Sequence, residues 1–242
     1  MRPRQFFIKT GENMYLKLSP RLQCIADYIR PGDRVIDVGT DHAYIPIYLL
    51  QNEISQCVTA TDIRPGPLEN AAADAKKYQV DERLTLLLCD GLRDCTPEMA
   101  DTVILAGMGG ETIQGILAAA PWALEKRLLL QPQSKQPELR AWLAAQGLTV
   151  SDASLVHDTG RLYLVWLVQR GVMPDCAAVE PALLAKRDPL LRPYIDDRIK
   201  RLRKQIRGME AAKAPDLGEL AACKAELEAL LNTYEEVAGW QA

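Results

Sequence analysis

Acidic residues and glycines follow a series of short apolar runs in the first half of the chain. The residues at or just after the ends of five successive runs, with their neighbours, are Asp37, Gly39, Thr40 and Asp41; Asp62 and Ile63; Asp90 and Gly91; Gly107, Met108, Gly109 and Gly110; Gln131 and Pro132. A carboxylate accepts hydrogen bonds from vicinal hydroxyls or from an exocyclic amino group. A glycine lets a ligand approach the backbone closely, because no Cβ intervenes. These residue types indicate a nucleoside site.

The same acids distinguish between nucleoside ligands. We expect Asp62 to bond ribose hydroxyls, Asp90 to accept from an exocyclic amino group, and Asp37 to lie near a positive charge. The carboxylates would repel a pyrophosphate, and the chain has no G-x-G-x-x-G after its first run and no G-x-x-x-x-G-K-[ST]. The pattern therefore favours S-adenosylmethionine, a ribonucleoside sulfonium, over NAD. Any one Asp or Gly has the alternative role of a turn residue, but four successive strand ends of this kind are harder to explain that way.

Apolar runs alternating with helix-length segments predict the elements that position these residues. The predicted strands are 34–38, 57–62, 84–89, 102–106 and 128–131, and the predicted helices are 43–51, 66–78, 111–119 and 137–145. Strands that are apolar on both faces predict a parallel sheet covered on both sides, here a doubly wound α/β sheet. Its ligands bind at the carboxyl ends of the strands. Runs 148–157 and 162–169, joined by a short turn, predict a terminal antiparallel hairpin.

The last third of the chain follows a different pattern. Apolar residues recur every three or four positions over 191–209 and again over 220–237, which predicts two amphipathic helices. Ala214-Pro215-Asp216 interrupts the repeat, and Asp216 with Glu219 is typical of a capping box. We therefore expect a catalytic domain over 1–174 and a coiled-coil-like helical hairpin over 175–242.

Composition bounds the class of protein. The chain has 242 residues, 48% hydrophobic and 25% charged, and a net charge of −3. Its six cysteines form no Cys-x-x-Cys pair, so the sequence indicates neither a zinc site nor a disulfide framework. It has no uncharged apolar run of membrane-spanning length and no signal-peptide pattern at its start. We expect a metal-free protein of the reducing cytoplasm.

The charges of the tail form two blocks. Residues 186–213 hold ten basic and four acidic side chains, whereas 214–242 hold six acidic ones and Lys224 alone. Two antiparallel helices with these charges could satisfy each other through flanking ion pairs. The excess of basic residues, which go most of the way around the first helix, favours RNA phosphates instead, with Arg198, Arg201 and Lys204 among the contacts.

Four stretches together resemble a known family. Lys17-Leu-Ser-Pro-Arg21, Asp37-Val-Gly-Thr-Asp-His-Ala-Tyr-Ile-Pro46, Ala106-Gly-Met-Gly-Gly-Glu111 and Leu130-Gln-Pro132 are similar to the bacterial tRNA adenine-N1 methyltransferases acting on position 22, the TrmK family. The resemblance covers essentially the whole chain and departs at Thr61–Pro67, so it implies no particular contact for Arg64. It implies a class I methyltransferase fold, S-adenosylmethionine as donor, and a C-terminal domain that helps to hold tRNA.

The expected chemistry needs positioning more than proton transfer. Adenine N1 has its own lone pair, so holding it in line with the methyl donor is the main requirement. We expect Asp41 to accept from the exocyclic amine, and His42 and Tyr44 to orient or stack the base. The remaining residues expected at the substrate are Arg21, Met108, Gly109, Gly110, Gln131 and Pro132.

Several alternatives stay open at this point. His42 could cap the following helix, Tyr44 could be ordinary packing, and Gly109-Gly110 could serve only to begin a helix. The runner-up functions are a methyltransferase acting on a small molecule or protein and a non-catalytic tRNA-binding protein. A nicotinamide-dependent oxidoreductase comes third, because the dinucleotide fingerprint is missing. A monomer is expected, although helical hairpins can self-associate.

Overall fold

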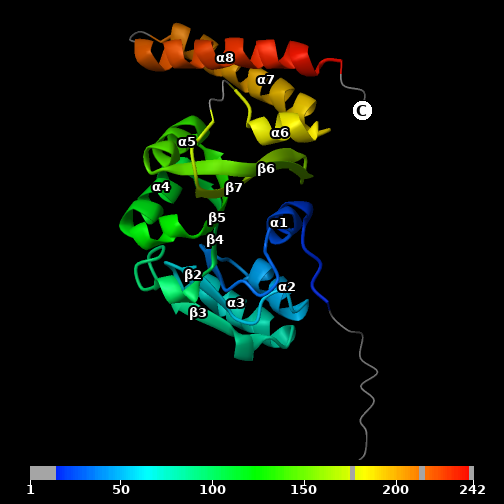
Figure 1. Ribbon diagram of the computed structural model, residues 1–242, viewed down its shortest axis with the longest axis vertical. Helices are drawn as coiled ribbons and strands as arrows, with labels where there is room; N and C mark the ends of the chain where they lie inside the picture. Colours follow the sequence, from blue (N-terminus) through cyan, green and yellow to red (C-terminus); the bar gives the residue numbers. More distant parts are fainter. Residues whose placement is uncertain (1–14, 175–177, 213–215, 240–242) are drawn as a thin grey trace, which may run out of the picture.

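Seven strands form a single mixed sheet, in the computed structural model, which describes residues 15–174, 178–212 and 216–239. Their order is β3-β2-β1-β4-β5-β7-β6 (Figure 1). The bounds are β1 Val35–Val38, β2 Val58–Asp62, β3 Leu84–Leu88, β4 Thr102–Gly109, β5 Arg127–Ser134, β6 Leu148–Asp158 and β7 Arg161–Arg170. Strands β1 to β5 pair in parallel, whereas β7 is antiparallel to both β5 and β6. The predicted α/β sheet with a terminal antiparallel hairpin is confirmed.

Helices cover both faces of the sheet, which is why its central strands are apolar on both sides. Helices α1 (Pro20–Ala26), α2 (Tyr44–Gln51) and α3 (Pro65–Lys77) share one core with the sheet, and α4 (Gly110–Ala119) and α5 (Gln136–Ala145) share the other. Figure 1 shows α4 and α5 on the opposite side of the sheet from α1 and α2. Every residue of β1 and β2 is buried between these layers.

The glycine-rich segment at 107–109 is strand rather than loop. The sequence predicts that the fourth strand ends at Ala106, but β4 continues to Gly109, and β5 likewise extends to Ser134. The pairing register shifts on both sides of Met108, so the extension is irregular. This irregularity re-aims the end of β4, as bulges near functional sites commonly do.

Helix α1 is short, and its hydrophobic spacing did not predict it. Ser19 precedes it, and the Ser19 hydroxyl donates to Asp158 of β6 over 2.7 Å. The same carboxylate accepts from the backbone N–H of Arg21 at 3.3 Å. Asp158 thus satisfies groups at the start of α1 that the helix itself leaves free, which ties this helix to the end of the hairpin.

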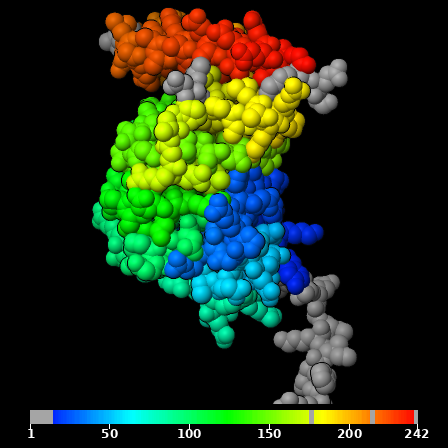
Figure 2. All heavy atoms as spheres, viewed as in Figure 1, coloured from blue at the N-terminus to red at the C-terminus, as the bar shows by residue number. Residues whose placement is uncertain are grey.

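The C-terminal helices form the predicted antiparallel pair. Helix α6 (Pro181–Lys186), also not predicted, precedes α7 (Leu191–Glu210) and α8 (Leu217–Val237). The two helices are antiparallel, because Arg198 in the first half of α7 pairs with Glu226 of α8, whereas Glu210 at the end of α7 pairs with Lys224, which comes earlier in α8. The Asp216 half of the predicted capping box is present, because Asp216 accepts from the backbone N–H groups of residues 218 and 219, whereas the Glu219 carboxylate accepts from Gln205 of α7 at 3.3 Å. Figure 2 shows the two helices as a layer at one end of the molecule.

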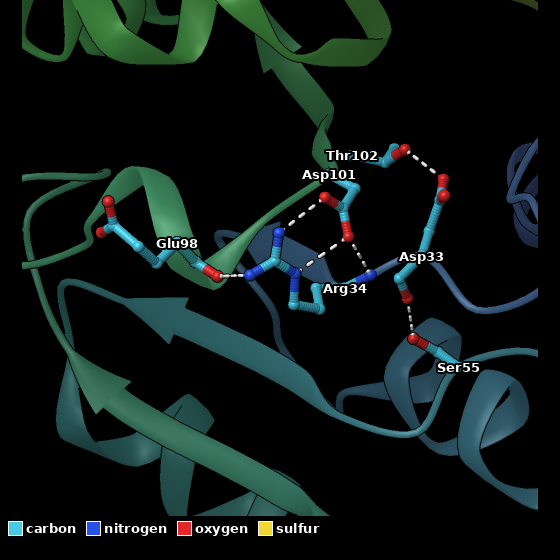
Figure 3. Close-up of polar contacts among 6 residues, drawn as sticks. All are labelled: Asp33, Arg34, Ser55, Glu98, Asp101 and Thr102. Carbon is cyan, nitrogen blue, oxygen red and sulfur yellow. Dashed lines mark hydrogen bonds and ion pairs between the residues drawn. The ribbon is translucent and has the colours of Figure 1, made fainter.

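A polar network fixes the amino-terminal edge of the sheet, opposite the carboxyl ends of the strands (Figure 3). Arg34, just before β1, reaches Asp101, just before β4, through Nη2–Oδ1 at 2.7 Å and Nε–Oδ2 at 2.9 Å. Beside this pair, the Thr102 hydroxyl donates to Asp33 at 2.7 Å. These contacts align β1 with β4 without entering the site. Within the described ranges, no helix is long and apolar enough to cross a membrane.

Candidate active site

The strand ends that carry the predicted site residues do converge. Strand β1 lies between β2 and β4, with Val38 opposite both Thr61 and Leu105. The backbone N–H groups of Gly39 and Thr40 both donate to the Thr61 carbonyl, at 2.8 and 3.0 Å. The Thr61 hydroxyl in turn donates to the Gly91 carbonyl at 3.1 Å. The loops after β1, β2 and β3 are therefore tied into one surface at the carboxyl edge of the sheet.

Two glycines with left-handed backbone, Gly39 and Gly107, lie on this surface, and we call the surface around them the cradle. Gly39 has a φ of +74°, and a Cβ added there would lie 2.3 Å from Cε of Met108. Gly107 has a φ of +78°, and its missing Cβ would lie 3.7 Å from Nε2 of Gln133 and 3.9 Å from Arg21. Left-handed backbone of this kind is adopted readily only by glycine. The cradle between β1 and β4 therefore depends on both residues.

Asp37 is a carboxylate buried in this edge, with 8% of the residue exposed. Burial raises the pKa of the Asp37 carboxyl to about 7, and a hydrogen bond from Thr40 and the charge of Arg21 counteract only part of that rise. A buried acid with a pKa this high gains from a positively charged partner. Asp37 therefore fits a cationic ligand group, as the sequence predicted.

Arg21 and Gln131 meet at the same edge although they lie far apart in the sequence. Nη1 of Arg21 donates to Oε1 of Gln131 at 3.2 Å, and Gln131 is only 1% exposed. The guanidinium also lies 5.5 Å from the centre of the Tyr163 ring. Sequence reasoning missed Tyr163 and Asp158, because both belong to the hairpin and reach the site only through the tertiary fold.

The residues after β2 and β3 differ in exposure. Asp62 is buried, and its Oδ1 accepts from the backbone N–H of Arg64 at 2.9 Å. Its neighbour Ile63 is exposed. Asp90 is half-exposed and pairs with Arg93 at 3.3 Å. Gly91 has a φ of +65° and abuts Ile116. Both carboxylates thus lie at the carboxyl ends of neighbouring strands, Asp62 at the end of β2 and Asp90 just after β3.

The loop after β1 presents three side chains. Asp41 is 76% exposed, and its Oδ2 lies 3.9 Å from Nε2 of His42. The His42 ring stacks on Tyr44, with ring centres 5.0 Å apart. His42 does not cap α2, because Ala43 is the capping residue and the Nδ1 atom of His42 bonds Asp74 at 2.8 Å instead. Tyr44 is the partly exposed first residue of α2, so core packing does not account for it.

Gly109 and Gly110 mainly begin the next helix. Gly109 is the capping residue of α4, and a Cβ on Gly110 would lie 2.6 Å from the Lys135 carbonyl oxygen. Met108 is partly buried and borders Gly39. The Pro132 carbonyl accepts from the Gln136 side chain at 3.0 Å. Gly110 therefore allows close packing against Lys135, Pro132 is buried within β5, and Met108 borders the cradle.

The three basic residues predicted to contact RNA divide into two groups. Arg198 is only 21% exposed, because it pairs with Glu226 of α8 and donates to Gln136 of α5 at 2.9 Å. The pairing with Glu226 is the ion-pair alternative raised by the sequence. The bond to Gln136 joins the helical pair to the sheet domain. Arg201 pairs with Asp197 within α7 but is 64% exposed. Lys204 is exposed on the same helix.

Comparisons with known proteins agree with this arrangement. Residues 18–166 match the family described as "Methyltransferase domain". The tRNA (adenine(22)-N(1))-methyltransferase of Bacillus subtilis is 34% identical over 158 residues, which cover 64% of this chain and 66% of that protein. A putative tRNA methyltransferase of Mycoplasma pneumoniae is 33% identical over 162 residues, which cover 66% of this chain and 71% of that protein.

A solved structure extends the likeness into the C-terminal helices. The crystal structure of the B. subtilis M1A22 tRNA methyltransferase TrmK has a TM-score of 0.73 to this chain at 26% identity, and the match covers 92% of this chain and 98% of that one. The match therefore takes in much of the α6–α8 region as well as the sheet. The chain belongs to the methyltransferase-domain family and, within it, to the TrmK family of tRNA (adenine(22)-N1)-methyltransferases.

Proposed function

We propose that this protein transfers a methyl group from S-adenosylmethionine to N1 of adenine 22 in tRNA. Family membership supports the reaction class. The observation that carries the proposal is the buried carboxyl of Asp37 beside the Gly39 cradle. A sulfonium donor with an ammonium group matches that carboxyl, whereas a dinucleotide with a pyrophosphate does not. The tRNA substrate places the reaction in the cytoplasm.

The residues around the cradle fit the donor. Asp37 would lie near the methionine ammonium, beside Gly39, which has no side chain, and Thr40, which bonds the Asp37 carboxyl. Asp62 would accept from the ribose hydroxyls. The other residues proposed to bind the donor are Ile63, Asp90, Gly91 and Gly107. When bound, the donor supplies an electrophilic methyl group on a positively charged sulfur.

The chain's own contribution to the chemistry is to hold the base. Because N1 of adenine needs no prior deprotonation, proximity and alignment supply most of the rate, a contribution worth up to about 7–11 kcal/mol. Asp41 would accept from the exocyclic amine as positive charge develops on the base. The stacked pair of His42 and Tyr44 would orient the ring, and Met108, with Gly107 and Gly109, would form the wall over which the base slides. The base must leave the tRNA stack to reach this edge.

The tRNA surface is proposed to continue along α7. Tyr194 and Arg198 of α7 both contact Gln136, at 3.2 and 2.9 Å, and Gln136 follows β5 by two residues. Helix α7 therefore passes beside the carboxyl edge of the sheet. Its exposed basic residues beyond this point are Lys200, Arg201, Arg203, Lys204 and Arg207. We assign residues 1–174 to catalysis and 175–242 to holding tRNA, with Arg198 serving the junction and not the RNA.

The test is methyl transfer from labelled donor to unmodified tRNA, followed by mapping of the modified base. We expect 1-methyladenine at position 22 and no transfer to a tRNA with guanine there. The Asp41→Ala variant should lose turnover while it still binds the donor by calorimetry. Undiminished turnover would remove Asp41 from the mechanism. Turnover without tRNA would favour a small-molecule or protein substrate, and donor binding without any turnover would favour a non-catalytic protein.

A further inference from the structure

Helix α3 reaches into the loop after β1 through one carboxylate. Asp74, in the last turn of α3, has its Oδ2 2.8 Å from Nδ1 of His42, and its side chain is only 20% exposed. The Tyr44 ring stacks on a face of the imidazole, with 18° between the ring planes. Asp74 therefore holds the edge of the His42 ring through Nδ1, and Tyr44 packs against the face of the ring.

This contact determines which nitrogen of His42 carries a proton. An ionised carboxylate only accepts hydrogen bonds, so Nδ1 must be the donor to Asp74. In the neutral ring Nε2 is then left with its lone pair. Nε2 lies 3.9 Å from Oδ2 of the exposed Asp41. The lone pair of Nε2 and the carboxylate of Asp41 therefore form two neighbouring acceptors. Without Asp74 the ring could carry its proton on Nε2 and present a donor there instead.

We propose that Asp74 is a positioning residue that sets the Nδ1–H tautomer of His42, so that Nε2 and Asp41 accept the two N–H bonds of the adenine 6-amino group. The proposal rests on the proposed function, because it requires adenine as the substrate base. Methylation at N1 places positive charge on the N1–C6–N6 amidine. Both hydrogen bonds strengthen as that charge develops, so they favour the transition state over the bound substrate.

The tautomer itself is measurable without turnover. The chain contains two histidines, so long-range 1H–15N spectra of the labelled full chain show two rings, and a His157→Gln variant assigns them. In the neutral form of the ring, which these spectra distinguish from imidazolium, His42 should carry its proton on Nδ1. In Asp74→Asn the proton should move wholly or partly to Nε2. The matched control is Glu69→Gln, an exposed carboxylate on the same helix, which should leave the spectrum unchanged. A wild-type ring protonated on Nε2 overturns the proposal.

Kinetics on two substrates test what the tautomer does. On tRNA with adenine at position 22, Asp74→Asn should lower kcat about 10-fold to 100-fold, the effect of losing one hydrogen bond to a charged group, with KM for the donor unchanged. On tRNA with purine at that position, which lacks the 6-amino group, Asp74→Asn and wild type should be equally slow. Asp74→Glu should recover part of the loss, and thermal melts check folding.

The outcomes separate the two proposals. An equal loss on adenine and purine, or no loss on either, overturns the role of Asp74 and leaves the methyltransferase function standing. Absence of wild-type transfer to adenine 22 overturns the proposed function. It also overturns the proposed contact with the adenine 6-amino group, whichever tautomer the spectra show.

Discussion

Replacing Asp37 with asparagine should stabilise the ligand-free protein at alkaline pH while it removes donor binding. Folding buries the Asp37 carboxyl and raises its pKa from 3.8 to about 7. The folded protein therefore binds more protons than the unfolded chain between these two values. The free energy of unfolding must then fall as the pH rises through that window, and the loss is complete above pH 7.

The size of the effect follows from the same shift. At 1.36 kcal/mol for each pKa unit, the ionised Asp37 destabilises the fold by about 4 kcal/mol above pH 7. Asparagine has nearly the same shape and stays neutral, but its amide N–H bonds need acceptors that the carboxyl did not, at a cost of about 1–3 kcal/mol. That cost does not depend on pH, so Asp37→Asn should be about 1–3 kcal/mol more stable than wild type at pH 8, and the difference in stability between the two proteins should change by about 4 kcal/mol from pH 4 to pH 8.

Urea denaturation of both proteins at pH 4, 6 and 8 measures this difference, with Asp81→Asn, an exposed aspartate, as the control. Calorimetry at pH 8 should show donor binding to wild type and none to Asp37→Asn. A stability difference between the two proteins that stays constant from pH 4 to pH 8 would refute the argument, because it would mean that Asp37 is not desolvated. Donor affinity of wild type should also weaken as the pH falls below 7, since the protonated carboxyl no longer attracts an ammonium.

Three further predictions concern the cradle, the RNA surface and the sheet edge. Gly39→Ala should destabilise the protein by about 1–2 kcal/mol through left-handed backbone strain alone. It should also weaken donor binding, because the new Cβ would displace Met108. The control Gly66→Ala on α3, which has open space around it, should change neither stability nor donor binding in this way. Lys204→Glu should weaken tRNA binding and reduce the slope of log affinity against log salt by about 1. The control Arg30→Glu should change neither the affinity nor the slope. A flat salt dependence in wild type would exclude α7 as an RNA-binding surface. Asp101→Asn should lower Tm at pH 7, because Arg34 holds the pKa of Asp101 well below its usual range (Figure 3). That loss should shrink as the pH falls below about 4, where the unfolded chain takes up a proton on Asp101 while the folded protein still holds the carboxyl ionised.

Much of the site's framework could be predicted because it depends on local patterns. Buried strands and their helices are visible as apolar runs and alternating segments, so the order of elements around Asp37 and Gly39 follows from the sequence. Strand ends were less predictable. The extension of β4 through Met108 depends on pairing with β5, which no local pattern encodes. The same holds for α1, whose first turn is held by Asp158 from the distant hairpin.

By itself the sequence determined the fold class, which strands are followed by carboxylates and glycines, and the antiparallel helical tail, since these follow from periodicity and residue type. The tertiary structure alone decided what each side chain contacts. It buried Asp37 enough to raise its pKa, paired His42 with Asp74 instead of a helix end, and directed Arg198 to Glu226 and Gln136 rather than outward. The reason is that burial and hydrogen-bond partners arise between residues tens of positions apart, whose proximity exists only after the chain has folded.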